Sequence, residues 1–192
     1  MNQWRKRLNG NLSPVLLAED PRPSISAYHD MPFAIFYSPP QDEFALRKEV
    51  TLLRIRLEQS GKRVTVISLA ECLHTALVNE GFANEALAVA EKTVGLGATI
   101  ETIHQILSDY QPLEDLVAAR VPAEADPLLD VVFLVRAGAL FPFYRTSALL
   151  EHLRGMVHVP TVLFYPGVLD GAAGLRFMGV LDPEHNYRPK IF

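Results

Sequence analysis

Cysteine is almost absent from this sequence, since Cys72 is the only one among 192 residues. A single thiol cannot form a disulfide within the chain, and a zinc site built from several cysteines is excluded as well. An excess of charge of one sign is also missing: 21% of the residues are charged, which is normal for a soluble globular protein, and the formal net charge is −4. This balance gives no general electrostatic reason to bind nucleic acid, although a local basic patch stays possible.

Long apolar runs are missing too. The best candidate for a membrane span is interrupted by Arg136, and it falls short of the ~18 apolar residues that a span needs. The apolar stretch near the start, PVLLA, is shorter than the core of a secretory signal. We therefore expect a cytoplasmic protein.

The sequence also lacks the glycine-rich loops that hold phosphates. After the first expected strand it reads YSPPQDEFALRK, which has no glycine and has two prolines without a backbone N–H group. No G-x-G-x-x-G follows any expected strand, and the third strand ends at Arg136 rather than at an acidic residue that could hold Mg²⁺. These absences argue against ATP or dinucleotide binding, and we expect no cofactor.

Residue types that commonly carry catalysis or bind metals are scattered. There is no G-x-S-x-G nucleophile elbow, and Cys72 occupies an apolar position of an expected helix, where we predict a buried thiol. The six histidines include no close pair, and Asp170, Asp182 and Glu184 are interpreted as solvated turn residues. We expect no catalytic residues and no metal site.

Apolar runs alternate with amphipathic stretches along most of the chain. Strands are expected, with helices between them, at 32–37, 62–69, 128–135, 160–165 and 175–181. This alternation predicts an α/β fold, a single domain over 32–192 with a mostly parallel sheet of about five strands and helices on both faces. Such a fold is similar to a degenerate Rossmann or P-loop-like fold without its phosphate site. Residues 1–31, with several prolines and serines, are expected to form an irregular lead-in segment with room for one short helix.

The helix expected from Pro39 to about Ser60 has one apolar stripe and a basic outer face. The stripe consists of Leu46, Val50, Leu53 and Leu57. The basic residues, a weak candidate for nucleic-acid contact, are Arg47, Lys48, Arg54 and Arg56. Glu43 stands four residues before Arg47, and further glutamates interleave. This pattern favours a solvated face of mixed charge over a DNA-binding face.

The richest chemistry follows the third and fourth strands. In open α/β proteins, sites lie just past the carboxyl ends of such strands. The segments DVVFLVRAGALFPFYRTSALLEHL and PTVLFYPGVLDG place aromatic and arginine side chains there. Two interpretations stay open: the aromatics form core while Arg145 makes a local contact, or the residues form a recognition surface. The candidate interaction residues are Arg136, Gly138, Phe141, Tyr144, Arg145, Tyr165, Pro166, Gly167, Asp170, Tyr187 and Arg188.

From about Pro21 to the end, the sequence resembles BrxB, the small B component of BREX phage-defence systems. The resemblance rests on PFAIFYSPPQDE, on the two segments quoted above and on the closing NYRPKIF, in the order and spacing of that family. The sequence departs from the family pattern at Arg136, where glycine is common, and at Thr146-Ser147, where Ser-His is usual.

The resemblance implies a role in bacterial antiphage defence alongside the alkaline-phosphatase-like PglZ protein, a large ATPase and an adenine methyltransferase. The family has no established catalytic residues to transfer to this sequence. We therefore expect a non-enzymatic assembly or adaptor subunit that binds another BREX component, with PglZ as the first choice of partner.

Two alternatives differ in class. One is an enzyme with an unrecognised nucleotide or metal site near Arg136, Arg145, Tyr165 and Asp170. The other is a subunit that contacts DNA through the basic helix at 47–63, as part of a complex.

Overall fold

A computed structural model of the chain describes residues 2–26, 31–82, 84–171, 174–185 and 187–192. Its centre is a sheet with the strand order β2-β3-β4-β1-β6, in which neighbouring strands run parallel. The strands are β1 (Phe33–Ser38), β2 (Arg63–Ser68), β3 (Asp130–Val135), β4 (Thr161–Asp170) and β6 (Lys190–Ile191). The prediction of a single α/β domain with a mostly parallel sheet is confirmed.

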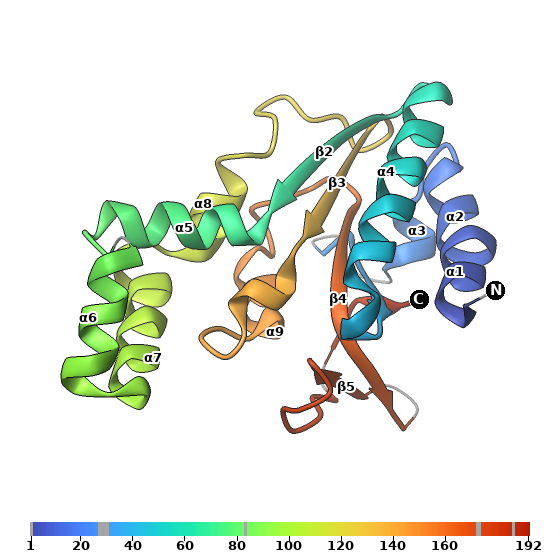
Figure 1. Cartoon of the computed structure of the whole chain (residues 1–192). Coiled ribbons are helices and arrows are strands. Elements are labelled where there is room, and N and C mark those ends of the chain that lie inside the picture. The colour runs from blue at the N-terminus through green and yellow to red at the C-terminus, as the bar shows by residue number, and fades with distance from the viewer. Residues whose placement is uncertain (1, 27–30, 83, 172–173, 186) are drawn as a thin grey trace.

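The helices cover the two faces of the sheet in separate groups (Figure 1). One face is packed by α1 (Gln3–Arg7), α2 (Ser13–Leu17), α3 (Arg22–Ile25) and α4 (Glu43–Gln59). The other is packed by α5 (Leu69–Asn79), α7 (Leu96–Gln105), α8 (Leu113–Ala118) and α9 (Thr146–His152). Between α5 and α7, α6 (Asn84–Val94) forms a hairpin with α7 that extends away from the sheet (Figure 1).

The first helices correct the expected irregular lead-in segment. Residues 3–17 are helical throughout, with a π-helical turn, Leu8–Leu12, between α1 and α2. Trp4, Leu8, Leu12 and Leu16 recur every four residues and are buried in one core cluster with the sheet. Pro14 hides this stripe in the sequence, because proline is disfavoured inside a helix; in the structure it lies just after the π-helical turn Leu8–Leu12, where the regular bonding pattern of the helix is interrupted. The expected segment also spans residues 27–30, which lie outside the described residues.

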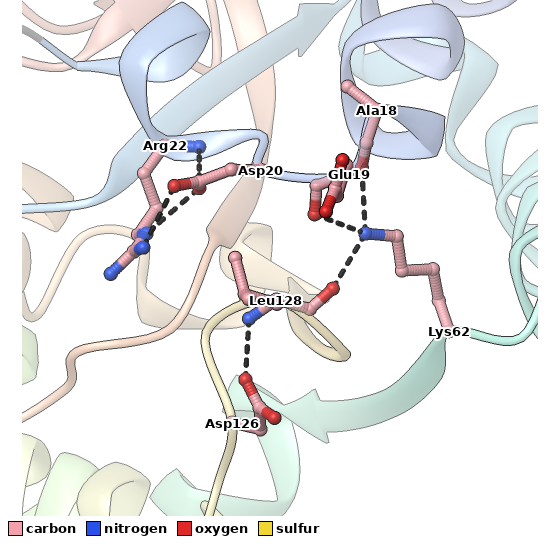
Figure 2. A network of polar contacts seen from close by, with 7 residues as sticks. All are labelled: Ala18, Glu19, Asp20, Arg22, Lys62, Asp126 and Leu128. Carbon is pink, nitrogen blue, oxygen red and sulfur yellow. Dashed lines mark hydrogen bonds and ion pairs between the residues drawn. The ribbon is translucent and has the colours of Figure 1, made fainter.

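Lys62 joins three distant segments at the amino ends of the strands (Figure 2). Its Nζ donates hydrogen bonds to the carbonyl oxygens of Ala18 at 2.7 Å, Glu19 at 3.0 Å and Leu128 at 2.7 Å. The ammonium group has three donors, so these bonds use its full capacity in a buried position. This network fixes the end of the N-terminal helices against the loops that lead into β2 and β3.

The chain after Tyr165 differs from the predicted turn. β4 continues through Pro166 and Gly167 to Asp170 and pairs antiparallel with β5 (Gly174–Phe177). A Cβ atom at Gly167 would lie 2.5 Å from the Arg176 carbonyl oxygen, so the missing side chain permits this close pairing. The expected strand at 175–181 accordingly ends early, since residues after Phe177 turn back and Met178 donates its N–H to the Pro166 carbonyl at 2.9 Å.

Candidate functional site

An open groove lies beside α4 at the carboxyl ends of β3 and β4, next to the edge strand β2. It consists of two adjoining hollows of about 210 and 280 Å³, which share Glu43, Arg47 and Arg136. We call it the arginine groove. Its apolar floor is formed by Leu46, Val50, Val66, Val135 and Phe164, and Gly138, Pro166 and Met178 extend it past the end of the sheet.

Arg136 occupies the first position after β3 with a left-handed backbone, φ 60° and ψ 36°. This conformation is uncommon for residues other than glycine. The resemblance described above implies glycine at this position, and a left-handed backbone is what glycine accepts most readily. The chain therefore places an arginine at a position whose backbone would accept glycine without strain, and the side chain lines both hollows of the groove.

Three guanidinium groups border the groove. Arg47 pairs with Glu43 at 2.9 Å, which confirms the predicted i, i+4 pair, and Arg54 pairs with Glu58 at 2.8 Å. Arg136 has no ion-pair partner among the residues that the structure describes. In the structure, the arginines of the basic helix and Arg136 at the end of β3 therefore line one groove, although the sequence pattern indicated two separate candidate sites.

The other two basic residues predicted on this helix lie elsewhere. Lys48 is exposed and does not line the groove. Arg56 faces the N-terminal helices, where it donates a hydrogen bond to Asn9 Oδ1 at 2.8 Å. The basic residues of α4 therefore do not form one continuous face, and only Arg47 and Arg54 share the groove with Arg136.

A second part of the predicted rim is closed. Arg145 forms an ion pair with Glu184, and Tyr187 donates its hydroxyl hydrogen to Glu184 Oε2 at 2.9 Å. The crevice that Arg145, Thr146, Glu184 and Tyr187 line has essentially no free volume (≈ 0 Å³). Burial alone would raise the pKa of Glu184, but hydrogen bonds from Arg145, Ser147 and Tyr187 outweigh it and keep this pKa below its ordinary value. We call this set the closed network.

Two of the predicted tyrosines are core residues. Tyr165 is 0% exposed and its ring lies 5.3 Å from that of Phe177, while Tyr144 is 4% exposed with its hydroxyl 3.2 Å from His152 Nδ1. Burial raises the pKa of Tyr144 to about 12 and also raises the pKa of Tyr165. Neither side chain offers a surface in this conformation, so their participation in binding stays a prediction.

Two of the remaining candidates lie in the arginine groove, and the others make contacts outside both regions. Gly138 and Pro166 line the arginine groove. Phe141 packs edge-on against Phe177 at 6.0 Å, and Gly167 is buried. Asp170 pairs with Arg176 at 2.7 Å and Arg188 with Glu151 at 3.8 Å.

The apolar floor was not predicted from the sequence. Val66 and Val135 lie on strands that we expected to be covered on both faces, so their partial exposure was missed. The available signal is alternation, because Val64 and Val66 lie on one face of β2 and Ile67 on the other. Which strand occupies the edge of the sheet cannot be derived from that alternation.

No group of three or more His, Cys, Asp or Glu side chains is arranged to hold a metal ion among the described residues. Cys72 is 0% exposed, as predicted, and burial raises the pKa of its thiol. Within the described part of the chain, none of the helices is long and apolar enough to cross a membrane.

Comparison with known proteins decides the family. The family model described as "BREX protein BrxB" matches residues 65–191, from β2 through β6. This chain belongs to the BrxB family. A curated relative, BREX protein BrxB of Bacillus cereus (strain H3081.97), is 27% identical over 165 residues, which cover 83% of this chain and 82% of the relative. No solved structure matches the chain significantly.

Membership confirms the resemblance seen in the sequence. It implies that the chain is a component of a BREX phage-defence system and that other BREX proteins are its partners. The matched residues include Val66, Arg136, Arg145 and Glu184, and therefore parts of both the arginine groove and the closed network.

Proposed function

We propose that this chain is a non-enzymatic assembly subunit of a BREX system and that it binds the alkaline-phosphatase-like PglZ protein through the arginine groove. The choice of a protein partner follows from family membership, which implies other BREX proteins as partners. The choice of PglZ follows from the resemblance that the sequence shows to the small B component of these systems.

The observation that supports this surface is the combination of an apolar floor with arginines at its border. Protein interfaces have apolar centres and are enriched in arginine and aromatic residues. Arginine is also one of the residue types whose truncation most often weakens binding. The arginine groove brings Arg47, Arg54 and Arg136 beside Val66, Val135 and Phe164.

Co-purification tests the proposal. The tagged chain is expressed with PglZ, with the large ATPase and with the methyltransferase in separate experiments, and the eluted species are weighed by light scattering. A stoichiometric complex with PglZ supports the proposal. A complex with another neighbour keeps the assembly role and changes the partner, whereas a monomer in the presence of every neighbour contradicts the proposal.

A further inference from the structure

One face of β2 lacks the helix cover that the rest of the sheet has. Val66 is 41% exposed, whereas Phe133, its register partner on β3, is 0% exposed. On the opposite face of β2, Ile67 is 2% exposed. Parallel sheets occur almost only with both faces covered. The cover on this face therefore thins along β2: Val64 still packs against the core cluster beneath α4, and the strand is left bare further on, at Val66.

The bare strip is one strand wide, about half the width of a helix. Neighbouring strands lie about 4.8 Å apart and a helix with its side chains is about 10 Å across. A helix beside α4 would rest on the face of β2 and reach past the free edge of the sheet. Its apolar side would contact Val66 and Val135, and Val50 and Thr51 of α4 would form the adjacent wall.

The charges that flank this strip are mainly positive. Arg47 and Arg54 are seven residues apart on α4, which is about two turns or ~10 Å along the helix. Arg136 adds a third guanidinium at the carboxyl end of β3. Arg47 and Arg54 each pair with a glutamate, Glu43 and Glu58, so the excess positive charge comes from Arg136, which has no ion-pair partner among the described residues. This local charge contrasts with the net charge of −4 of the whole chain. An occupant with acidic side chains is therefore favoured over a neutral or basic one.

We propose that the arginine groove binds an amphipathic helix of the partner protein. Its apolar side packs on Val66, Val135 and Phe164, and acidic residues on its flank pair with Arg47, Arg54 and Arg136. This inference rests on the proposed function, because the helix belongs to the BREX component that binds there. A helix fits better than an added strand, since the bare surface is a sheet face and the α4 arginines border that face rather than the edge of β2.

Charge reversal with matched controls tests the groove. Arg54→Glu and Arg136→Glu are each expected to weaken the affinity for the partner that co-purifies with the wild-type chain at least about tenfold. Lys48→Glu makes the same charge change on α4 outside the groove and is expected to leave the affinity within about twofold, since charges away from a contact contribute little. Thermal unfolding of each variant shows that the fold is retained.

Photo-crosslinking identifies the occupant. p-Benzoylphenylalanine replaces Val66, and in the control it replaces Val89, which is 63% exposed on α6. In the purified complex, the probe at position 66 should attach to one partner segment whose acidic and apolar residues repeat every three to four positions. Attachment to a segment without that repeat, to a second copy of this chain or to DNA overturns the inference, as does equal affinity of the Arg54, Arg136 and Lys48 variants.

The two proposals fail in different ways. If a complex forms but the groove variants bind normally, the helix inference falls and the assembly role stands. If the wild-type chain binds none of its neighbours, the assembly role falls and the helix inference falls with it.

Discussion

The arginine groove and the closed network each contain an arginine that follows β3, but the two arginines differ in whether they have an ion-pair partner. Arg136 and Arg145 both follow β3, but Arg145 pairs with Glu184 whereas Arg136 has no ion-pair partner among the described residues. The difference comes from a later segment. Glu184 and Leu175 exchange backbone hydrogen bonds of 2.9 and 3.0 Å, which bring the Glu184 carboxylate over Arg145. An arginine past a strand end therefore marks a binding surface only where no later segment supplies its counter-ion.

The largest expected effect is a difference in the free energy of unfolding between a variant in the core and a variant in the arginine groove. Tyr165→Ala removes a fully buried core ring that packs against Tyr187 of the closed network, and should lower the free energy of unfolding by about 3–5 kcal/mol. Arg136→Ala, at the exposed groove, should change it by no more than about 0.5 kcal/mol. Urea unfolding of both variants measures the contrast, and equal losses would show that the groove is part of the core.

A smaller effect concerns the Arg145–Glu184 pair. Arg145→Ala leaves the mostly buried Glu184 carboxylate without its guanidinium, but the Arg145 side chain is 55% exposed and solvent screens the pair. We expect a loss of about 1 kcal/mol. Adding Glu184→Gln should recover part of that loss, because the two residues act as one unit. Strictly additive losses would argue against the pair.

The closed network also predicts a pH dependence. The pKa of Glu184 is lower in the folded protein than in the unfolded chain, so the unfolded chain takes up its proton first as the pH falls. The stability that Glu184 contributes is present above its unfolded pKa of about 4.3 and is lost as the pH falls through the lower folded value. The stability gap between the wild-type chain and Glu184→Gln should therefore shrink below about pH 4. A gap that stays constant from pH 7 to pH 3 would contradict this.

The smallest expected stability effect is at the groove itself. Arg136→Gly removes the strain of the left-handed backbone at φ 60° in the folded protein, but it also increases the conformational entropy of the unfolded chain. We expect these two effects on the free energy of unfolding to cancel to within about 0.5 kcal/mol. The same variant should still weaken partner binding, because the guanidinium is lost. A destabilisation above about 1 kcal/mol would mean that Arg136 supports the fold.

A helix or strand of this fold was predictable where its own residues show a clear apolar pattern. The stripe Leu46, Val50, Leu53 and Leu57 predicted α4, and all four residues are buried. The run DVVFLV predicted a buried β3 for the same reason. The N-terminal helices were missed because their stripe passes through Pro14, and β5 was misplaced because its pairing depends on the close approach at Gly167.

The site was predictable only in part, because its geometry is set by contacts between distant segments. The sequence identified Arg136 and Arg145 together, without showing that Glu184 folds over one of them. It also assigned Arg47 and Arg54 to a separate basic helix, whereas the structure places them with Arg136. The position of β2 at the sheet edge, which exposes Val66, depends on strand order and is not encoded locally.

The most direct test compares the two arginines in one binding experiment. Arg136→Glu and Arg145→Glu are each co-expressed with the BREX neighbour that the wild-type chain binds, and the complexes are weighed by light scattering. The expected result is that Arg136→Glu elutes as a folded monomer while Arg145→Glu, although less stable, still forms the complex. A complex that survives Arg136→Glu and is lost with folded Arg145→Glu would contradict it, and would place the interface on the closed network instead.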